Sequence, residues 1–454
     1  MRKIFFIAFV CIISSVTIAG IFDNSEYASR RRKLMEKIHD GIAIIRGAQQ
    51  SGSYMEYYQN NDFIYLTGVE LPNAVLIIDG KKKESTIFFT SSVRAARNEG
   101  IPVELINNPV LYTGIENYKR YENLSASLKE YSSRDYIFYT SFKPEELMRV
   151  CSNEMLGSFQ RNITDNEWDG RLTRELQFVE VLKKKYPGVN IKDCSQKIWE
   201  LRVIKSQAEI AILRKAGRIG VKAHTEMIKS TRPGMYEYEL AALYEYYCKK
   251  EGAQDLAYYA IICSGPNHPY YHYYKHDRLL KDGEFLVIDV GPDYAYYDID
   301  ITVSYPVSGK FTPRQKEIYE ACNAVHEANM KVYRPGLTSK QCRMEVAEIL
   351  KKQGFDLTKD YFQRMQGGFG HYVGMSVHDV GGGPSVLKAG MVIANEPLIS
   401  YPDEELGFRV EDTILITEDG CENLTAGIPR TVEEIETIMK QVGVIQTLQK
   451  NKLY

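Results

Sequence analysis

The sequence lacks the charge pattern of a nucleic-acid binder and the cysteine pattern of a thiolate metal site. Lysine and arginine total 57 against 59 aspartates and glutamates, so no overall positive field is available to hold a phosphate backbone. The eight cysteines contain no Cys-x-x-Cys pair. Nucleic acid is therefore excluded as a partner, a metal held by thiolates is disfavoured, and no disulfide pairing can be assigned.

The sequence also lacks an apolar run long enough for a stable membrane span. The N-terminus reads Met1-Arg2-Lys3, followed by an apolar run over residues 4–13 and by small residues up to Ala19. About 20 apolar residues are needed to cross a bilayer, so a cleaved export signal is favoured over an uncleaved anchor. We predict a signal peptide over residues 1–19 and an exported product, either periplasmic or secreted.

Length and hydrophobic content predict two folded domains. A single core stops growing near about 250–300 residues, whereas this chain has 454 residues, 44% of them hydrophobic. Residues 20–195 alternate charged, helix-like stretches with β-rich runs, which is typical of an α/β domain. These runs cover residues 42–45, 74–78, 86–90 and 136–139. Residues 196–454 have a different pattern and are predicted to form the second domain.

The second domain contains two segments that look like copies. Ser206 and Glu209 form a capping box that opens a helix, which ends before Arg232-Pro233-Gly234. A second helix, opened by Thr312-Pro313, ends before Arg334-Pro335-Gly336, and in both copies a glycine follows the proline after nineteen residues. Strand-rich regions follow each copy. We predict an α+β domain with an internal pseudo-two-fold duplication, although coincidence between two ordinary helix stops is the alternative.

Four acidic residues and one histidine are candidates for a metal centre. Asp289 lies in a buried apolar strand over residues 285–291, and Glu396 ends a similar run over residues 391–396. The full set is Asp289, Asp300, His371, Glu396 and Glu411. Carboxylates gathered in a low dielectric repel one another unless cations balance them. Two divalent ions would supply that charge, generate a nucleophile and polarise a carbonyl, so the set predicts hydrolysis.

The motifs around these residues resemble the aminopeptidase P and prolidase family of metallopeptidases. The matching motifs are Ile288-Asp289-Val290-Gly291, Asp300-Ile301-Thr302, Gly370-His371-Tyr372-Val373-Gly374, Val377-His378-Asp379, Glu396-Pro397 and Arg409-Val410-Glu411-Asp412. Residues 61–68, with Pro72-Asn73-Ala74-Val75, resemble that family's N-terminal domain. The resemblance covers nearly the whole chain after the predicted signal, and it implies a catalytic domain of the pita-bread fold.

The resemblance also implies roles for individual residues. It makes the five candidates metal ligands, with Asp300 and Glu411 bridging two ions. Mn²⁺ is the expected metal, with Co²⁺ or Zn²⁺ as alternatives. His272 and His378 match two further positions, where an imidazole donates to the substrate carbonyl or to the developing oxyanion. Arg409 is expected to orient the carboxylate of Glu411.

The function implied by the resemblance is that of an Xaa-Pro aminopeptidase, which acts on peptides with proline in the second position. Two alternatives stay open: an Xaa-Pro dipeptidase, and a non-catalytic pita-bread module that binds peptides. Retention of all five ligands argues against the module, and the export signal favours the aminopeptidase. A homo-oligomer is compatible with the sequence.

Two positions depart from the family pattern. Gly367 stands four residues before His371, where many members have a histidine, and Val303-Ser304 stands where Arg-Thr is common. Both departures lie outside the metal ligands, so they bear on substrate positioning and rate rather than on binding of the ions.

Overall fold

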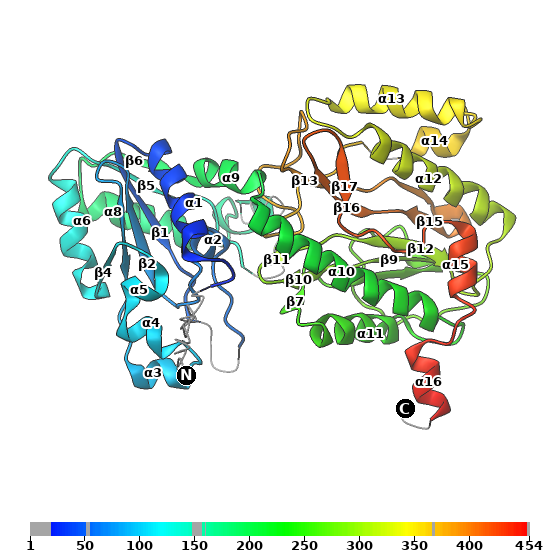
Figure 1. Cartoon of the computed structure of the whole chain (residues 1–454), viewed down its shortest axis with the longest axis horizontal. Helices are drawn as coiled ribbons and strands as arrows, with labels where there is room; N and C mark the ends of the chain where they lie inside the picture. The colour runs from blue at the N-terminus through cyan, green and yellow to red at the C-terminus, as the bar shows by residue number, and fades with distance from the viewer. Residues whose placement is uncertain (1–19, 51–54, 148–156, 159, 366–367, 452–454) are drawn as a thin grey trace, which may run out of the picture.

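The computed structural model describes residues 20–50, 55–147, 157–158, 160–365 and 368–451, which form two lobes (Figure 1). The predicted signal peptide lies outside the described residues. The first lobe and the connection after it contain α1 (Asn24–Lys37), β1 (Gly41–Arg46), α2 (Asn61–Thr67), β2 (Val75–Asp79), β3 (Glu84–Phe88), α3 (Val93–Asn98), α4 (Val103–Asn107), α5 (Pro109–Thr113), β4 (Asn117–Lys119), η1 (Tyr121–Asn123), α6 (Leu124–Ser132), β5 (Ile137–Thr140), η2 (Gln160–Thr164), α8 (Arg174–Lys185), β6 (Ile191–Asp193) and α9 (Ser195–Val203). Within the described ranges, no helix has both the length and the apolar character that a membrane crossing requires.

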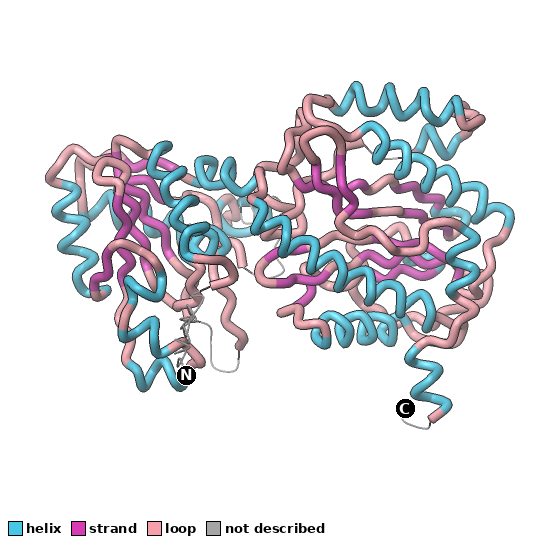
Figure 2. Tube along the Cα trace, viewed as in Figure 1, coloured by secondary structure: helices cyan, strands magenta, loops and turns pink. Residues whose placement is uncertain are grey.

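The second lobe is larger and contains the remaining elements. They are α10 (Gln207–Ser230), α11 (Glu237–Lys250), β7 (Asp255–Leu256), β8 (Ile261–Ser264), η3 (Gly265–Asn267), β9 (Phe285–Asp289), β10 (Pro292–Tyr294), β11 (Tyr297–Asp298), β12 (Thr302–Pro306), α12 (Pro313–Val332), α13 (Ser339–Lys352), α14 (Asp360–Arg364), β13 (Val392–Asn395), β14 (Leu398–Tyr401), η4 (Pro402–Glu404), β15 (Leu406–Arg409), β16 (Asp412–Ile416), β17 (Cys421–Asn423), α15 (Val432–Ile438) and α16 (Val444–Lys450). Figure 2 shows its strands enclosed by helices.

The first lobe is a mixed sheet covered on both faces, as the β-rich runs predict. Its strand order is β4-β3-β2-β1-β5-β6. In β1, Ile42 and Ile44 pack on one face with Leu128 and Leu182, which come from α6 and α8. The alternate residues of β1 belong to the core on the other face, together with apolar residues of α1 and α2. Because both faces are buried, the strands are almost continuously apolar rather than alternating.

The second lobe has the duplicated architecture predicted from its two matched segments. Capping boxes at Ser206 and at Thr312 open the long helices α10 and α12, and each long helix is followed by a partner, α11 or α13. Strands β12-β9-β8 form one three-stranded sheet, and β13-β16-β17 form the other. An isolated bridge between Thr302 and Glu411 joins the two halves.

Buried polar contacts hold the lobes against each other. On α1, Arg30 lies 3.6 Å from the carboxylate of Glu209 in α10, and it also donates to the hydroxyl of Tyr297 in β11. The hydroxyl of Tyr58 donates to Asp293 in β10 at 2.9 Å. These side chains come from both lobes and are buried or, for Tyr58, half-buried, so separating the lobes would expose unpaired charge.

The cysteines in the described part of the chain are free thiols. Five of them are buried, and Cys421 is half-buried. Burial raises the pKa of Cys421 to about 11, so this thiol is protonated near neutral pH. These cysteines therefore act as small apolar residues in the core.

His224, on α10, should make the protein sensitive to mild acid. Its ring is fully buried, its Nε2 lies 2.9 Å from the carbonyl oxygen of Val290, and burial lowers its pKa from 6.5 to about 3. Between these values the unfolded chain binds a proton that the folded chain does not. Stability therefore falls as pH drops from 6.5 toward 3, by up to about 1.4 kcal/mol per pH unit from this group.

Urea unfolding at pH 7, 5.5 and 4.5 would measure this effect. We expect His224→Gln, which stays neutral at every pH, to lose less stability on acidification than the wild type. The matched control is His39→Gln, at an exposed site. Equal pH slopes for wild type and His224→Gln would contradict the prediction.

Candidate metal centre

The first half of the second lobe contributes two aspartates. Asp289 ends β9, where its backbone pairs with Thr302 of β12 on one side and with Ile261 of β8 on the other. Asp300 lies two residues before the start of β12, in the short segment between β11 and β12. Both carboxylates are almost fully buried. The apolar sequence of β9 buries it on both faces, and the acid is carried into the interior with it.

The second half contributes the other three residues. Glu396 directly follows β13, and Glu411 lies at the bridge to Thr302, whose hydroxyl donates to Glu411 Oε2 at 2.6 Å. His371 lies on a loop fixed to β13, because the amide of Ala394 donates to its carbonyl oxygen. The bridge that joins the two halves is therefore also the point where their acidic side chains meet.

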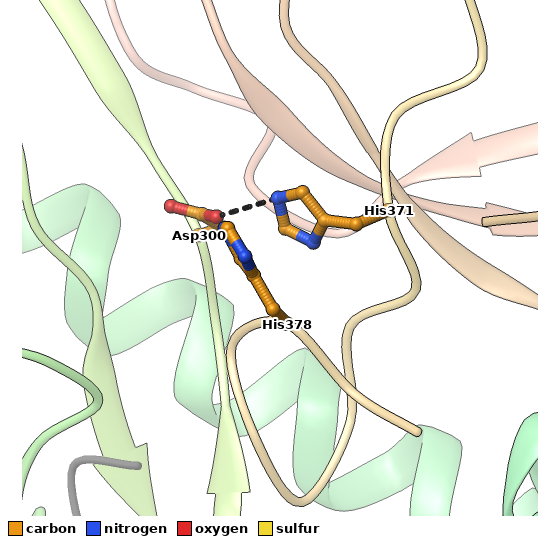
Figure 3. Close-up of side chains that lie close together, drawn as sticks. All are labelled: Asp300, His371 and His378. Atoms are coloured by element: carbon orange, nitrogen blue, oxygen red, sulfur yellow. Dashed lines mark ion pairs between the residues drawn. The ribbon is translucent and has the colours of Figure 1, made fainter. Parts of the chain in front are cut away.

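The structure brings all five predicted ligands together. Three groups each have candidate ligand atoms within 4.8 Å of one another, and together they contain Asp289, Asp300, His371, Glu396 and Glu411, with His378 as an additional member. His371 Nε2 lies 3.3 Å from Asp300 Oδ2 and 3.6 Å from Glu396 Oε1. Figure 3 shows the imidazole of His371 directed at Asp300, with His378 beside both.

The electrostatics of this cluster fit bound cations. Burial and repulsion from the neighbouring carboxylates raise the pKa of Glu411 well above its usual value. Burial, with repulsion from Asp300, raises the pKa of Asp289 to about 6 despite the attraction of Arg409. Burial alone would lower the pKa of His371, but Asp300 and Glu396 raise it to about 9. The cluster thus has an excess of negative charge that divalent ions would balance.

Comparison with known proteins identifies the family. The model of metallopeptidase family M24 matches residues 211–418, and the model of the aminopeptidase P N-terminal domain matches residues 27–99. The Xaa-Pro aminopeptidase of Escherichia coli K12 is 31% identical, over 91% of this chain and 97% of its own length. The chain belongs to metallopeptidase family M24. The predicted family, the fold class and the activity of a metallo-exopeptidase are thereby confirmed.

Two further relatives of this peptidase bear on metal and substrate. The solved structure of zinc-substituted E. coli aminopeptidase P in complex with product matches with a TM-score of 0.75 and 29% identity, covering 92% of this chain and 98% of that one. The Xaa-Pro dipeptidase of Rattus norvegicus is 28% identical, over 91% of this chain and 93% of its own length. The M24 fold therefore accommodates divalent metal ions.

Arg409 has a different ion-pair partner from the one predicted. Its Nη2 lies 2.7 Å from Asp289 Oδ2, whereas the sequence suggested Glu411. The prediction assumed a continuous strand, in which residues two apart share a face. In the structure β15 ends at Arg409 and β16 begins at Asp412, so the alternation does not extend across the break. The guanidinium reaches instead to the end of β9.

Tyr258 belongs to the centre and was missed by sequence reasoning. Its hydroxyl lies within hydrogen-bonding distance of Asp289 Oδ1 and, at 2.5 Å, of Asp300 Oδ1, so its single proton is shared between the two carboxylates. It lies three residues before β8, the strand whose Ile261 pairs with Asp289. The position of Tyr258 just before the strand that pairs with Asp289 was the sequence feature that could have pointed to it. The phenol fixes the separation of the two aspartates.

The two predicted catalytic histidines have different surroundings. The ring of His378 lies 3.8 Å from that of His371, so His378 is at the metal centre. His272 lies on an exposed stretch, where its carbonyl oxygen accepts from the hydroxyl of Tyr259 at 3.2 Å. Its catalytic role stays a prediction.

The two departures from the family pattern also have different outcomes. Gly367 lies outside the described residues. Ser304, at the other departure, has a structural role: its hydroxyl donates to the carbonyl oxygen of Arg409 at 2.8 Å and accepts from the amide of Arg409 at 3.0 Å. Ser304 thereby helps to fix the backbone at the end of β15.

Proposed function

We propose that the protein is an Xaa-Pro aminopeptidase, which uses two divalent ions to release the N-terminal residue from peptides with proline in the second position. The observation that supports this most directly is the five-residue cluster at the junction of the duplicated halves. Such a cluster needs cations, and two ions in a carboxylate-rich site promote hydrolysis of an acyl bond by activating water and polarising the carbonyl.

The chain's own residues perform four tasks in this proposal. The five-residue cluster would hold the ions. Tyr258 and Thr302 fix the carboxylates of Asp289, Asp300 and Glu411 through hydrogen bonds. His378, beside Asp300 and His371, donates a hydrogen bond to the substrate carbonyl as negative charge develops on its oxygen. Glu396 passes a proton toward the leaving proline nitrogen.

Exposure distinguishes Glu396 from the other acids. Its side chain is 25% exposed, compared with 7% for Asp289 and 6% for Asp300. Of these carboxylates, Glu396 is best placed to exchange protons with solvent. The buried acids are better suited to holding metal.

A peptide panel tests the function and separates it from its alternatives. With Mn²⁺ added, we expect Ala-Pro-Ala to be cut after alanine and N-acetyl-Ala-Pro-Ala to be inert. Cleavage of Ala-Pro alone would favour the dipeptidase. Equal rates for Ala-Ala-Ala and Ala-Pro-Ala would overturn proline specificity, and no cleavage of any peptide by metal-loaded protein would favour the non-catalytic module.

Metal, location and assembly are further parts of the proposal. Mn²⁺ suits a site with mostly carboxylate ligands and one imidazole, with Co²⁺ or Zn²⁺ as alternatives. Export through the segment ending at Ala19 would bring the enzyme to extracellular or periplasmic peptides. A homo-oligomer is compatible with the proposal.

Metal analysis at saturation should give two equivalents per chain, and a limit of one would contradict the two-ion site.

A further inference from the structure

A second group of buried charges lies between the lobes. We define the interlobe ion cluster as Asp62, Glu146, Arg202, Lys205 and Asp379. Arg202 Nη1 lies 2.8 Å from Asp62 Oδ1, and its Nη2 lies 2.8 Å from Glu146 Oε2 and 2.7 Å from Asp379 Oδ1. Lys205 Nζ lies 3.1 Å from the other oxygen of Asp379. One guanidinium thus contacts three carboxylates.

The members of the interlobe ion cluster come from separate parts of the chain. Asp62 is on α2 and Glu146 follows β5, so both belong to the first lobe. Arg202 is on α9, the connecting helix, and Asp379 belongs to the second lobe. Arg202, Lys205 and Asp379 are each only 1% exposed. Ions this deeply buried are tolerated only when their partners are held in place, so the cluster fixes the relative positions of these segments.

The cluster reaches the metal centre through a single peptide bond, because Asp379 directly follows His378. Burial alone would raise the pKa of Asp379, but Arg202 and Lys205 lower it below its usual value, so this carboxylate stays ionised and paired. Its own amide donates to the carbonyl oxygen of Tyr372 at 2.8 Å. The two ends of the loop over residues 372–379 are therefore tied together at Asp379.

The first lobe also holds this loop directly. Asn61 Nδ2 donates to the carbonyl oxygen of Met375 at 2.7 Å. At Gly374, a side chain would not fit, because an added Cβ would lie 2.1 Å from Asp379 Oδ2 and 2.8 Å from Lys205 Nζ. The loop backbone therefore packs closely against the charged groups, and its conformation depends on where those groups lie.

We infer that Arg202 is a positioning residue for His378. By binding Asp379 in the second lobe together with Asp62 and Glu146 in the first, Arg202 holds the loop that places the imidazole of His378 beside Asp300 and His371. The first lobe is thereby part of the machinery that sets the catalytic geometry. This inference rests on the proposed function, in which His378 donates to the substrate carbonyl.

The test compares two buried arginines that both connect the lobes. Arg202→Lys keeps the charge but replaces the planar fork, whose two nitrogens reach three carboxylates, with a single nitrogen, whereas Arg30→Lys alters the contacts with Glu209 and Tyr297 and leaves the ion pairs of Asp379 in place. We expect Arg202→Lys to lower kcat for Ala-Pro-Ala by about 10-fold or more, with a much smaller change in KM and two bound metal equivalents retained. Arg30→Lys should leave kcat within about 3-fold of wild type.

Asp62→Asn adds a variant that keeps shape and removes one charge, in case Arg202→Lys does not fold. It leaves Arg202 with two of its three carboxylates and should lower kcat by a smaller factor than Arg202→Lys, again with metal retained. Equal loss of kcat in Arg202→Lys and Arg30→Lys, or unchanged kcat in folded Arg202→Lys or Asp62→Asn, would overturn the positioning role. An inactive, metal-loaded wild type would instead refute the proposed function.

Discussion

Glu411→Gln should abolish peptide hydrolysis and at the same time stabilise the metal-free protein. Glutamine has the shape of the protonated glutamate but lacks the negative charge that would hold divalent ions, so we expect kcat/KM to fall by on the order of 10³-fold or more, as loss of several kcal/mol of transition-state stabilisation implies. Burial and the neighbouring carboxylates raise the pKa of Glu411 well above 4.5. In the absence of metal, the negative charge at this position is therefore unfavourable to folding.

The sign of the stability change follows from this raised pKa. Below the unfolded pKa of 4.5 both folded and unfolded chains carry the proton. As pH rises from 4.5 through the folded pKa, the unfolded chain ionises first, and the metal-free wild type loses stability. The glutamine side chain of the variant does not ionise, so the advantage of the variant should grow with pH over that window.

Urea unfolding at pH 5 and pH 8 would compare the stability of wild type and Glu411→Gln after a chelator has removed the metal. Metal analysis and peptide assays would measure metal binding and hydrolysis by the same two proteins. The matched control is Asp293→Asn, because Asp293 is also buried and burial raises its pKa to about 7, but it does not belong to the metal groups. Asp293→Asn should retain metal and activity. A folded Glu411→Gln variant that hydrolyses Ala-Pro-Ala at the wild-type rate would refute the assigned ligand set.

The strands that carry the metal centre could be predicted from the sequence because each has a strong local pattern of residues. An acid inside or at the end of an apolar run, as with Asp289 and Glu396, needs compensation in any fold. Capping residues at Ser206 and Thr312 placed the starts of both long helices correctly. These signals are local, so they do not depend on knowing which segments meet in three dimensions.

Contacts between distant segments could not be predicted in this way. Arg409 pairs with Asp289 because a strand break redirects the chain, and no sequence period marks that break. The contact from Arg202 to Asp379 spans 177 residues, and the contact from Arg202 to Asp62 spans 140. Charged residues of this kind are usually exposed, so their burial becomes evident only when the lobes are assembled.

Gly291→Ala should disrupt the centre without altering any ligand. Gly291 lies two residues after Asp289, where the chain turns toward the hairpin that leads to Asp300. An added Cβ would lie 1.5 Å from the carbonyl oxygen of Ile299, and backbone atoms cannot move aside as a flexible side chain can. The segments that carry Asp289 and Asp300 would have to separate, which should cost about 3 kcal/mol of stability, the upper end of the range for overpacking.

The same displacement would separate the two aspartates that Tyr258 now joins, and a shift of about 1 Å at a catalytic site costs on the order of 10²-fold in rate. We therefore expect Gly291→Ala to unfold at a lower urea concentration than the wild type and to bind fewer than two metal equivalents. Its kcat/KM should fall by on the order of 10²-fold or more. Gly420→Ala is the matched control, because the nearest atom to its added Cβ, Thr417 Oγ1, lies at 3.9 Å. If Gly291→Ala matched Gly420→Ala in stability and rate, the backbone between Asp289 and Asp300 would be free to adjust, and the close approach of the two segments would not be what sets the geometry of the centre.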